Sequence, residues 1–427
     1  MHASSTSLFI LSLCLAAYTI TTIVTIRKDK FGYIIVAFCI YHIAFLFLPA
    51  LFHTANNLFP FYASSHNEEI QVKTAIICMA FTIFFLAGFF LTHPVSKKKY
   101  SHDKFKISRN NFNIAITIIA TALIGVIAVY GLNNFLIPRK DFSNAAFGGD
   151  ATTGTIIVTA SRAASFLIVL FTLRFKQDLA PISFYTSLAV AITLFTIINF
   201  PLSLSRYLFF SYILAILYIH TEATTKNKLL LFLAFSVGTI TIFPFFNFIT
   251  RGTSDSFELA IFDYYTTSGD FDGYQSIINV VKFTEDHFFT YGGQIIGALF
   301  IFVPRSIWVD KPFATGQIAA ENMGYQFTNI SSPLISELYI DFGYFGVTIL
   351  AFLTGVVIRK IDSYSITSKT NNNQSGILVC AVIFSLSLIV LRGALIGVAS
   401  TVALELLMAF FLAKFTVKKT RPKQQQR

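Results

Sequence analysis

Long apolar runs recur along the whole chain, and each is long enough to cross a membrane as a helix. A helix rises about 1.5 Å per residue, so about 20 residues match a hydrocarbon core about 30 Å thick. The composition agrees, because 55% of the residues are hydrophobic and only 12% are charged, whereas soluble domains carry about 25% charged residues. The sequence therefore predicts an all-α, polytopic integral membrane protein.

Eleven runs define the predicted transmembrane helices. They lie at 7–26, 31–52, 72–92, 112–132, 155–173, 181–200, 203–221, 229–248, 338–358, 376–392 and 394–413. Eight form an N-terminal membrane bundle within residues 1–248, and three form a C-terminal group within 338–417, followed by a basic tail at 418–427. Residues 249–337 are predicted to be one large loop with short amphipathic or re-entrant helices. Loops longer than about 15 residues are usually functional or disordered, and the aromatic motifs of this one favour a function.

The basic residues predict the orientation. Of the 32 Lys and Arg residues, 22 lie in six regions, at 27–30, 97–109, 174–176, 226–228, 359–369 and 414–427. Cytoplasmic connections of membrane proteins carry an excess of Lys and Arg, so all six are expected in the cytoplasm. The N-terminus and the large loop then face outside. A further span at the apolar stretch 295–303 would reverse this pattern, so that stretch is predicted to be interfacial, re-entrant or packed against the bundle.

Several kinds of partner are not expected. The net charge of +11 comes from basic residues at many membrane boundaries, not from one basic face, so the sequence predicts no nucleic-acid partner. Its four cysteines, Cys14, Cys39, Cys78 and Cys380, lie within predicted spans, which leaves no outer disulfide framework. His287 is the only histidine of the loop, so no metal site is expected there.

Three arginines lie inside or at the end of predicted spans, near the outer surface: Arg162, Arg206 and Arg392. A charged side chain within a span costs about 2.5–3.5 kcal/mol on insertion scales, so each needs a reason. A single arginine can snorkel to the interface. Three arginines at the same depth, together with Arg251 and Arg305 of the loop, instead favour a site that binds an anionic group at the membrane surface. Guanidinium groups bind phosphate oxygens in bidentate geometry.

The large loop contains ten acidic and four basic residues. Asp270 and Asp272 are candidates for a catalytic base, and the alternative for each is a capping role for the amphipathic run 273–283. Glu337, at the start of the ninth span, is a third candidate. Its alternative is a carboxylate stabilised by the helix macrodipole.

Aromatic residues accompany these polar groups in the loop. The rings of Tyr274, Tyr291 and Trp308 are suited to stack on sugar faces. An interfacial aromatic belt explains Tyr291 and Trp308 equally well.

The loop motifs occur in a distinctive order. After Arg251 the sequence reads GDFDGY at 269–274, TYGGQIIGAL at 290–299, VPRSIWVDKP at 303–312 and SELYIDFGYFG at 336–346. This order resembles the bacterial O-antigen polymerases (Wzy-type) and related oligosaccharide repeat-unit polymerases. The likeness covers 251–346, about a quarter of the chain, and elsewhere extends only to hydropathy and span number.

The resemblance implies a metal-independent glycosyltransferase without a cofactor, acting at the periplasmic face of the bacterial inner (cytoplasmic) membrane. Such enzymes transfer a growing glycan from its polyprenyl-diphosphate carrier to the next lipid-linked repeat unit. The implied partners are this polyprenyl-diphosphate-linked oligosaccharide, membrane lipid, a chain-length regulator and a flippase.

The candidate residues divide into three roles on this interpretation. The base is Asp272 or Glu337, with Asp270 next; the diphosphate ligands are Arg206, Arg251 and Arg305, supported by Arg392, Lys311 and Arg162; the sugar contacts are Tyr274, Tyr291 and Trp308. Arginines would stabilise the charge that develops on the leaving diphosphate, and the base would take the proton of the acceptor hydroxyl.

Three other functions stay open. A ligase that moves finished glycan onto a lipid acceptor uses the same donor, but it predicts one large transfer and no ladder of intermediate lengths. A transporter or flippase predicts charged or broken helices near the membrane midplane, for which Glu405 is the only acidic candidate. A membrane acyltransferase predicts a histidine motif, which His42 and His220 do not form.

Overall fold

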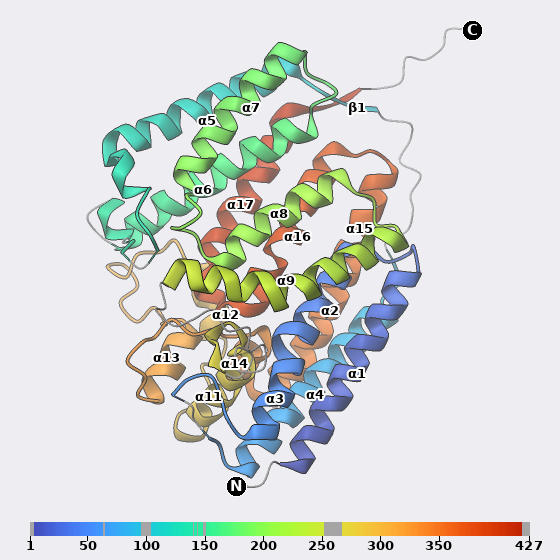
Figure 1. Ribbon diagram of the computed structural model, residues 1–427, viewed down its shortest axis with the longest axis vertical. Helices are drawn as coiled ribbons and strands as arrows, with labels where there is room; N and C mark the ends of the chain where they lie inside the picture. Colours follow the sequence, from blue (N-terminus) through green and yellow to red (C-terminus); the bar gives the residue numbers. More distant parts are fainter. Residues whose placement is uncertain are drawn as a thin grey trace.

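A computed structural model describes residues 4–62, 65–94, 104–139, 141–142, 144–147, 151–251 and 267–420. Within these ranges the chain is almost entirely helical (Figure 1), and nine helices are long and apolar enough to cross a membrane. The protein is therefore an all-α, multi-pass membrane protein, as the sequence predicts.

The first half of the chain supplies the N-terminal helices. These are α1 (Ser5–Arg27), α2 (Tyr33–Tyr41), η1 (His42–Phe47), α3 (Leu48–Asn56), α4 (Glu68–Leu91), α5 (Arg109–Tyr130), η2 (Leu132–Asn134), η3 (Asn144–Phe147), α6 (Ala151–Arg174), α7 (Pro181–Ile198), α8 (Arg206–His220) and α9 (Thr225–Arg251). The second half begins with four short helices and ends with the C-terminal spans. These are η4 (Gly269–Phe271), α11 (Gly273–Asp286), α12 (Gly293–Leu299), α13 (Thr315–Asn322), α14 (Leu334–Phe345), η5 (Gly346–Leu350), α15 (Ala351–Thr370), α16 (Gln374–Arg392) and α17 (Leu395–Thr416).

Each of the eleven predicted spans coincides with a helix. The second is continuous from Tyr33 to Asn56, with a π-helical turn at η1. The ninth runs from Leu334 to Thr370, so the predicted end at 358 is too early, because polar residues prolong the helix beyond its apolar part. Two of the predicted spans, α8 and α9, are not among the nine helices that are long and apolar enough to cross a membrane. Helix α8 has only 15 residues.

Two segments far apart in the sequence close the bundle at one end. Strand β1 (Lys104–Ile107) pairs antiparallel with strand β2 (Val417–Thr420). The start of α5 is thereby joined to the end of α17. Figure 1 shows this pair at the upper end, whereas α11, α13 and the start of α1 lie at the lower end. The described parts of two of the six basic regions, 104–109 and 414–420, thus lie on the same side.

Further basic residues bind backbone carbonyl groups on this side, and we call these four the basic end: Arg174, Lys228, Arg359 and Lys369. Lys228 is fully buried, with an exposed fraction of 0%. Its ammonium donates to the carbonyl groups of Thr25, Lys28 and Phe31, in the last turn of α1 and just after it, at 2.8, 2.9 and 3.2 Å. Lys369 donates to the carbonyl of Tyr218 in α8 at 2.7 Å. Arg174 of α6 binds Gln374 at 2.8 Å.

The closest helix packing in the bundle joins α4 and α15, and it depends on two glycines. A Cβ atom on Gly88 would lie 2.1 Å from the carbonyl oxygen of Phe352, and one on Gly355 would lie 2.2 Å from that of Phe85. Small residues allow such backbone contact between membrane helices, where packing drives association. Any larger side chain at either position would separate the two helices.

The described part of the large loop, 267–333, folds against the bundle. Helix α11 is buried from Gly273 to Val281. The predicted amphipathic run 273–283 is thus a helix, and α4, α13 and α14 pack around it. The apolar stretch 295–303 contains only the last residues of α12 and turns. It forms no helix long enough to cross a membrane.

The helix that follows this loop is broken near its start. Phe342 and Gly343 have non-helical backbone angles, and Gly343 has a φ of 58°. Just before the break, the Asp341 carboxylate accepts hydrogen bonds from the backbone N–H groups of Gln294 and Ile295 at 3.0 and 3.1 Å. Asp341 thereby caps the N-terminus of α12.

Candidate functional site

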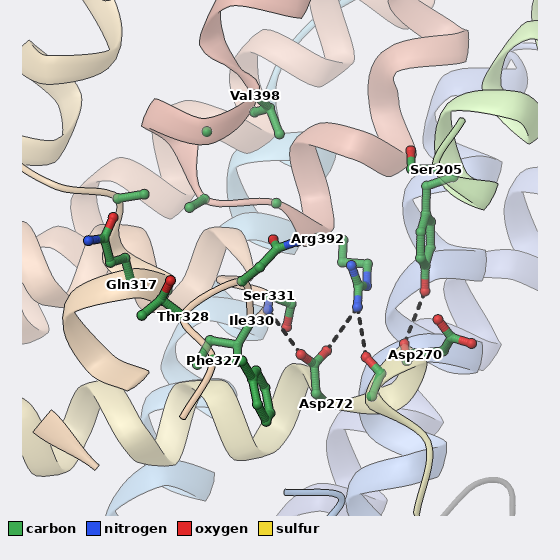
Figure 2. A pocket seen from close by; sticks show the side chains of 18 of the residues that line it. Ser205, Asp270, Asp272, Gln317, Phe327, Thr328, Ile330, Ser331, Arg392 and Val398 are labelled. Atoms are coloured by element: carbon green, nitrogen blue, oxygen red, sulfur yellow. Dashed lines mark hydrogen bonds and ion pairs between the residues drawn. The ribbon is translucent and has the colours of Figure 1, made fainter. Parts of the chain in front are cut away.

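A cavity of about 820 Å³ gathers residues from segments that are distant in the sequence. Its walls come from the loops 60–62, 267–272 and 327–331 and from the ends of α8, α13, α16 and α17. Four predicted site residues line it: Arg206, Asp270, Asp272 and Arg392. Figure 2 shows Asp272 and Arg392 at its centre, with Asp270 on one side and Gln317, Thr328 and Phe327 on the other.

The first ion pair joins α8 to η4. Ser205 caps α8 by accepting a hydrogen bond from the Leu208 N–H at 3.2 Å, which fixes the first turn and Arg206 within it. The Arg206 guanidinium meets both oxygens of Asp270, at 2.7 and 2.8 Å. Arg206 is 8% exposed and Asp270 is 4% exposed. This is the bidentate geometry that makes an Arg–carboxylate pair strong.

The second ion pair is looser and faces the cavity more openly. Arg392 is the last residue of α16, and its Nη2 donates to the carbonyl of Gly269 at 2.8 Å and to Asp272 Oδ1 at 3.2 Å. Its Nε has no hydrogen-bond partner among the described residues. The side chain is 23% exposed, and its guanidinium lies 4.4 Å from the ring centroid of Tyr207. Arg392 therefore has donor capacity left for a ligand.

Asp272 is a buried carboxylate at the wall of the cavity. It stands at the N-cap position of α11 but makes no capping hydrogen bond with its side chain. Instead Asp272 Oδ2 accepts from the backbone N–H of Ser331 at 2.9 Å. The capping alternative is thus wrong for Asp272. Burial raises the pKa of Asp272 above its usual range, against the lowering effects of Arg392 and of the Ser331 N–H.

Glu337 is a buried carboxylate near the start of α14. It is fully buried in the first turn of α14, where the macrodipole favours a carboxylate. Neither of its oxygens has a hydrogen-bond partner by distance and angle in the described part of the chain. Ser332 and Thr315 are its polar neighbours. Glu337 is not among the residues that line the cavity, whereas Asp272 is.

The other predicted basic residues lie away from the cavity. Arg305 donates to the carbonyl groups of Lys311 and Pro312, and its guanidinium lies 4.0 Å from the ring centroid of Phe313. Lys311 donates to carbonyl groups of its own loop at 2.6 and 3.0 Å. Arg162 binds Ser203 Oγ at 3.3 Å. The side chain of Arg251 lies outside the described residues.

The three predicted sugar contacts do not line the cavity either. Tyr274 is fully buried, and its hydroxyl donates to the carbonyl of Gln71 at 3.1 Å. Tyr291 is 70% exposed at the turn before α12. Trp308 lies half-buried in the loop that follows α12. Their assignment to sugar binding stays a prediction without support from this geometry.

Several lining residues were absent from the sequence prediction: Phe61, Tyr62, Arg139, Tyr207, Ser331 and Phe327. Tyr207 follows Arg206 directly, and its hydroxyl donates to the carbonyl of Asp270 at 3.0 Å. Its position next to Arg206 is the one feature of the sequence that could have indicated Tyr207 as a site residue. Nothing in the sequence indicates that residue 62 lies near residue 327.

No protein-family model, curated protein or solved structure matches this chain. The chemistry of the cavity is set by two arginine–aspartate pairs, Arg206–Asp270 and Arg392–Asp272, with Arg139 as a third arginine of the lining. Such a site can bind an anionic group through the arginines and remove a proton through a carboxylate of raised pKa.

Proposed function

We propose that this protein polymerises lipid-linked oligosaccharide repeat units of the O-antigen type. In the proposed reaction it transfers the growing glycan from a polyprenyl-diphosphate carrier to the next repeat unit, at the periplasmic face of the bacterial inner membrane. The N-terminus and the cavity face the periplasm in this proposal, and the basic end and the C-terminus face the cytoplasm.

One observation carries the proposal: two arginines and two aspartates, predicted separately from the sequence, meet on one cavity at the end of membrane helices. Helix α16 has 19 residues, about 28 Å at 1.5 Å per residue, which is close to the thickness of the hydrocarbon core. It begins beside Arg174 of the basic end and finishes at Arg392 of the cavity. A carrier lipid would present its diphosphate at that depth, because its polyprenyl tail stays in the membrane.

Arg392 is the preferred ligand for the diphosphate. Its Nη2 makes both hydrogen bonds to the described residues and its Nε is buried, so Nη1 is the donor that can reach phosphate oxygens. Arg206 is held by both oxygens of Asp270 and has a smaller exposed fraction. We therefore assign Arg206 to fixing the Gly269–Asp272 turn and to adding positive charge, and Arg392 to direct contact.

Asp272 is the preferred base. A base works best when its pKa approaches the operating pH, and burial shifts the pKa of Asp272 in that direction. When a diphosphate binds Arg392, it competes with Asp272 for the guanidinium. The pair at 3.2 Å is then weakened, and the pKa of Asp272 rises further. Binding of the donor thus activates the base.

The chemical step needs no redox partner. The Asp272 carboxylate removes the proton of an acceptor hydroxyl as that oxygen forms a bond to the anomeric carbon of the donor glycan. The bond between this carbon and the diphosphate oxygen breaks, and the electron pair leaves with the diphosphate. Arg392 and Arg206 stabilise the charge that develops on it, the role that a metal ion has in other glycosyl transfers. The proton stays on Asp272 until solvent removes it.

Transport of lipid-linked sugars is the second candidate, and the break at Phe342–Gly343 favours it. Broken helices are typical of transporters, in which they border the substrate site near the membrane midplane. The cavity lies at helix ends, however, and neither Phe342 nor Gly343 lines it. We therefore rank polymerisation above transport.

Deletion of the gene, followed by gel electrophoresis of the cell's polysaccharide, tests the proposal. We expect the ladder of lengths to disappear while one repeat unit remains attached to its acceptor. Loss of every attached repeat would indicate a ligase or a flippase, and an unchanged ladder would overturn the proposal. Purified full-length protein in nanodiscs, given lipid-linked repeat units, should then make polymer without other proteins.

A further inference from the structure

An aromatic platform lines part of the cavity, and it consists of Tyr62 and Phe327. Tyr62 is 57% exposed and Phe327 is 41% exposed, although both are large apolar rings. Their ring centroids lie 6.0 Å apart with an angle of 23° between the ring planes. The two rings therefore stack nearly parallel to one another, and each keeps part of its surface exposed.

The protein holds this platform in place by several contacts. Tyr62 has a φ of 59°, in the left-handed region that side chains other than glycine rarely adopt. Its hydroxyl accepts a hydrogen bond from the Gln326 N–H at 3.0 Å, which ties the two loops together. Strained backbone of this kind persists only where the surroundings enforce it, and it concentrates at ligand sites.

Helix α11 links the platform to the charged half of the cavity. Gln275, fully buried one turn after Asp272, accepts a hydrogen bond from the Phe61 N–H at 2.9 Å. Its amide also donates to the Tyr325 hydroxyl at 3.1 Å, and the Tyr325 ring lies 5.3 Å from that of Tyr62. The same short helix thus fixes both Asp272 and the platform.

Polar side chains border the platform. Gln317, Thr328 and Asn329 line the same cavity, and Figure 2 shows Gln317, Thr328 and Phe327 together, across from Asp270 and Ser205. A pyranose ring has the matching chemistry, because its C–H face is apolar and its hydroxyl rim is polar. Rings such as Tyr combine a large apolar face with a polar tip.

We propose that Tyr62 and Phe327 form a binding subsite for a sugar ring of the oligosaccharide, with Gln317, Thr328 and Asn329 binding its hydroxyl groups. This inference rests on the proposed function for the identity of the ligand. It also gives the substrate a direction: the diphosphate lies at Arg392, and the glycan extends from there across the cavity to the platform. The platform therefore discriminates between sugars, whereas the arginines do not.

Binding of a carrier-free glycan tests the subsite. The probe is the repeat-unit oligosaccharide released by mild acid from the lipid carrier of the source cells. Its binding to full-length protein in nanodiscs is measured by saturation-transfer NMR. Tyr62→Ala and Phe327→Ala should each weaken binding by about tenfold, the loss expected for one stacking contact. Tyr62→Phe keeps the ring and should retain most of the affinity.

Phe288→Ala is the matched control. Phe288 is also an exposed aromatic residue of the same large loop, with an exposed fraction of 87%, but it does not line the cavity. This variant should bind the oligosaccharide as the native protein does. Undecaprenyl diphosphate without sugar should bind all of these variants equally, which shows that they are folded.

The outcomes separate this inference from the proposed function. The subsite is overturned if the native protein does not bind the oligosaccharide, or if Tyr62→Ala and Phe327→Ala bind it normally. The polymerase can still stand in either case, provided that the ladder depends on the gene. Conversely, an unchanged ladder after gene deletion, together with oligosaccharide binding that depends on Tyr62 and Phe327, would leave the subsite in place and remove the polymerase.

Discussion

The cavity and the basic end lie at opposite ends of the same two packed helices, α8 and α16, yet they use cations differently. At the basic end, Lys228 and Lys369 donate to uncharged backbone carbonyl groups. In the cavity, Arg206 and Arg392 form ion pairs with carboxylates. The Arg392–Asp272 pair leaves part of the guanidinium available to a ligand. A cation on a helix-end carbonyl group stabilises the fold, whereas a cation paired loosely with a carboxylate can exchange it for a ligand.

This comparison predicts two kinds of defect. Changes in the cavity should reduce activity per molecule while the protein stays abundant in the membrane. Changes at the basic end should reduce abundance and thermal stability while each remaining molecule stays active.

Asp272→Asn should have the largest effect on activity. The amide keeps the shape and the hydrogen bond from Ser331 but cannot take a proton, so we expect a loss of about 10²–10⁴-fold in polymer formation. Initial rates with lipid-linked repeat units in nanodiscs measure it. Asp310→Asn is the control, because Asp310 is an exposed acid of the same loop. Equal rates for Asp272→Asn and the native protein would assign the base elsewhere, with Glu337 next.

Arg392→Ala should reduce polymer formation by about 10²–10³-fold, as the loss of one charge-stabilising donor does in other enzymes. It also leaves Asp272 buried without its cation, so abundance in the membrane must be measured alongside. Arg305→Ala is the matched control. The Arg305 donors are directed at carbonyl groups of its own loop, and we expect normal polymer. Loss of polymer in Arg305→Ala at normal abundance would bring that loop back into the site.

Lys228→Ala should destabilise the protein without changing its chemistry. Three carbonyl groups near the end of α1 lose a charged donor, and a buried unsatisfied group costs about 1–3 kcal/mol. The melting temperature and the abundance should fall, while the rate per folded molecule should not. Lys226→Ala, two residues earlier at an exposed position, should match the native protein in both. A lower rate per molecule would contradict the division between the two ends.

The smallest predicted effect is a shift in pH dependence. Asp272 acts as a base only when deprotonated, so activity should fall as the pH drops through its pKa, which burial places above the usual range. Arg392 lowers that pKa, so Arg392→Gln should move the acid limb of its residual activity to higher pH. A limb that moves to lower pH, or does not move, would show that another group controls it.

The sequence predicts the membrane helices well because an apolar run of sufficient length has few alternatives to a spanning helix. It also identifies Arg206, Asp270, Asp272 and Arg392 as chemically unusual. It does not pair them, because Arg206 is 64 residues from Asp270 and Arg392 is 120 residues from Asp272. Only the packing of α8 and α16 against the 267–272 turn brings them together.

The same reasoning explains which residues the sequence could not rank. Arg305 and Lys311 have the charge of phosphate ligands, but their short loop leaves carbonyl groups that their donors bind locally. Tyr62 and Phe327 have no charge and no motif, so their role depends entirely on two loops meeting in three dimensions.

The four cysteines, Cys14, Cys39, Cys78 and Cys380, are free thiols buried between helices. A maleimide reagent reacts with accessible thiols only. The native protein is therefore not labelled by it. Each of the variants Tyr62→Cys and Lys226→Cys would therefore carry one accessible thiol. That thiol lies at the cavity in the first variant and at the basic end in the second. An impermeant maleimide added to intact cells then reports which end faces outward, without removal of any native cysteine.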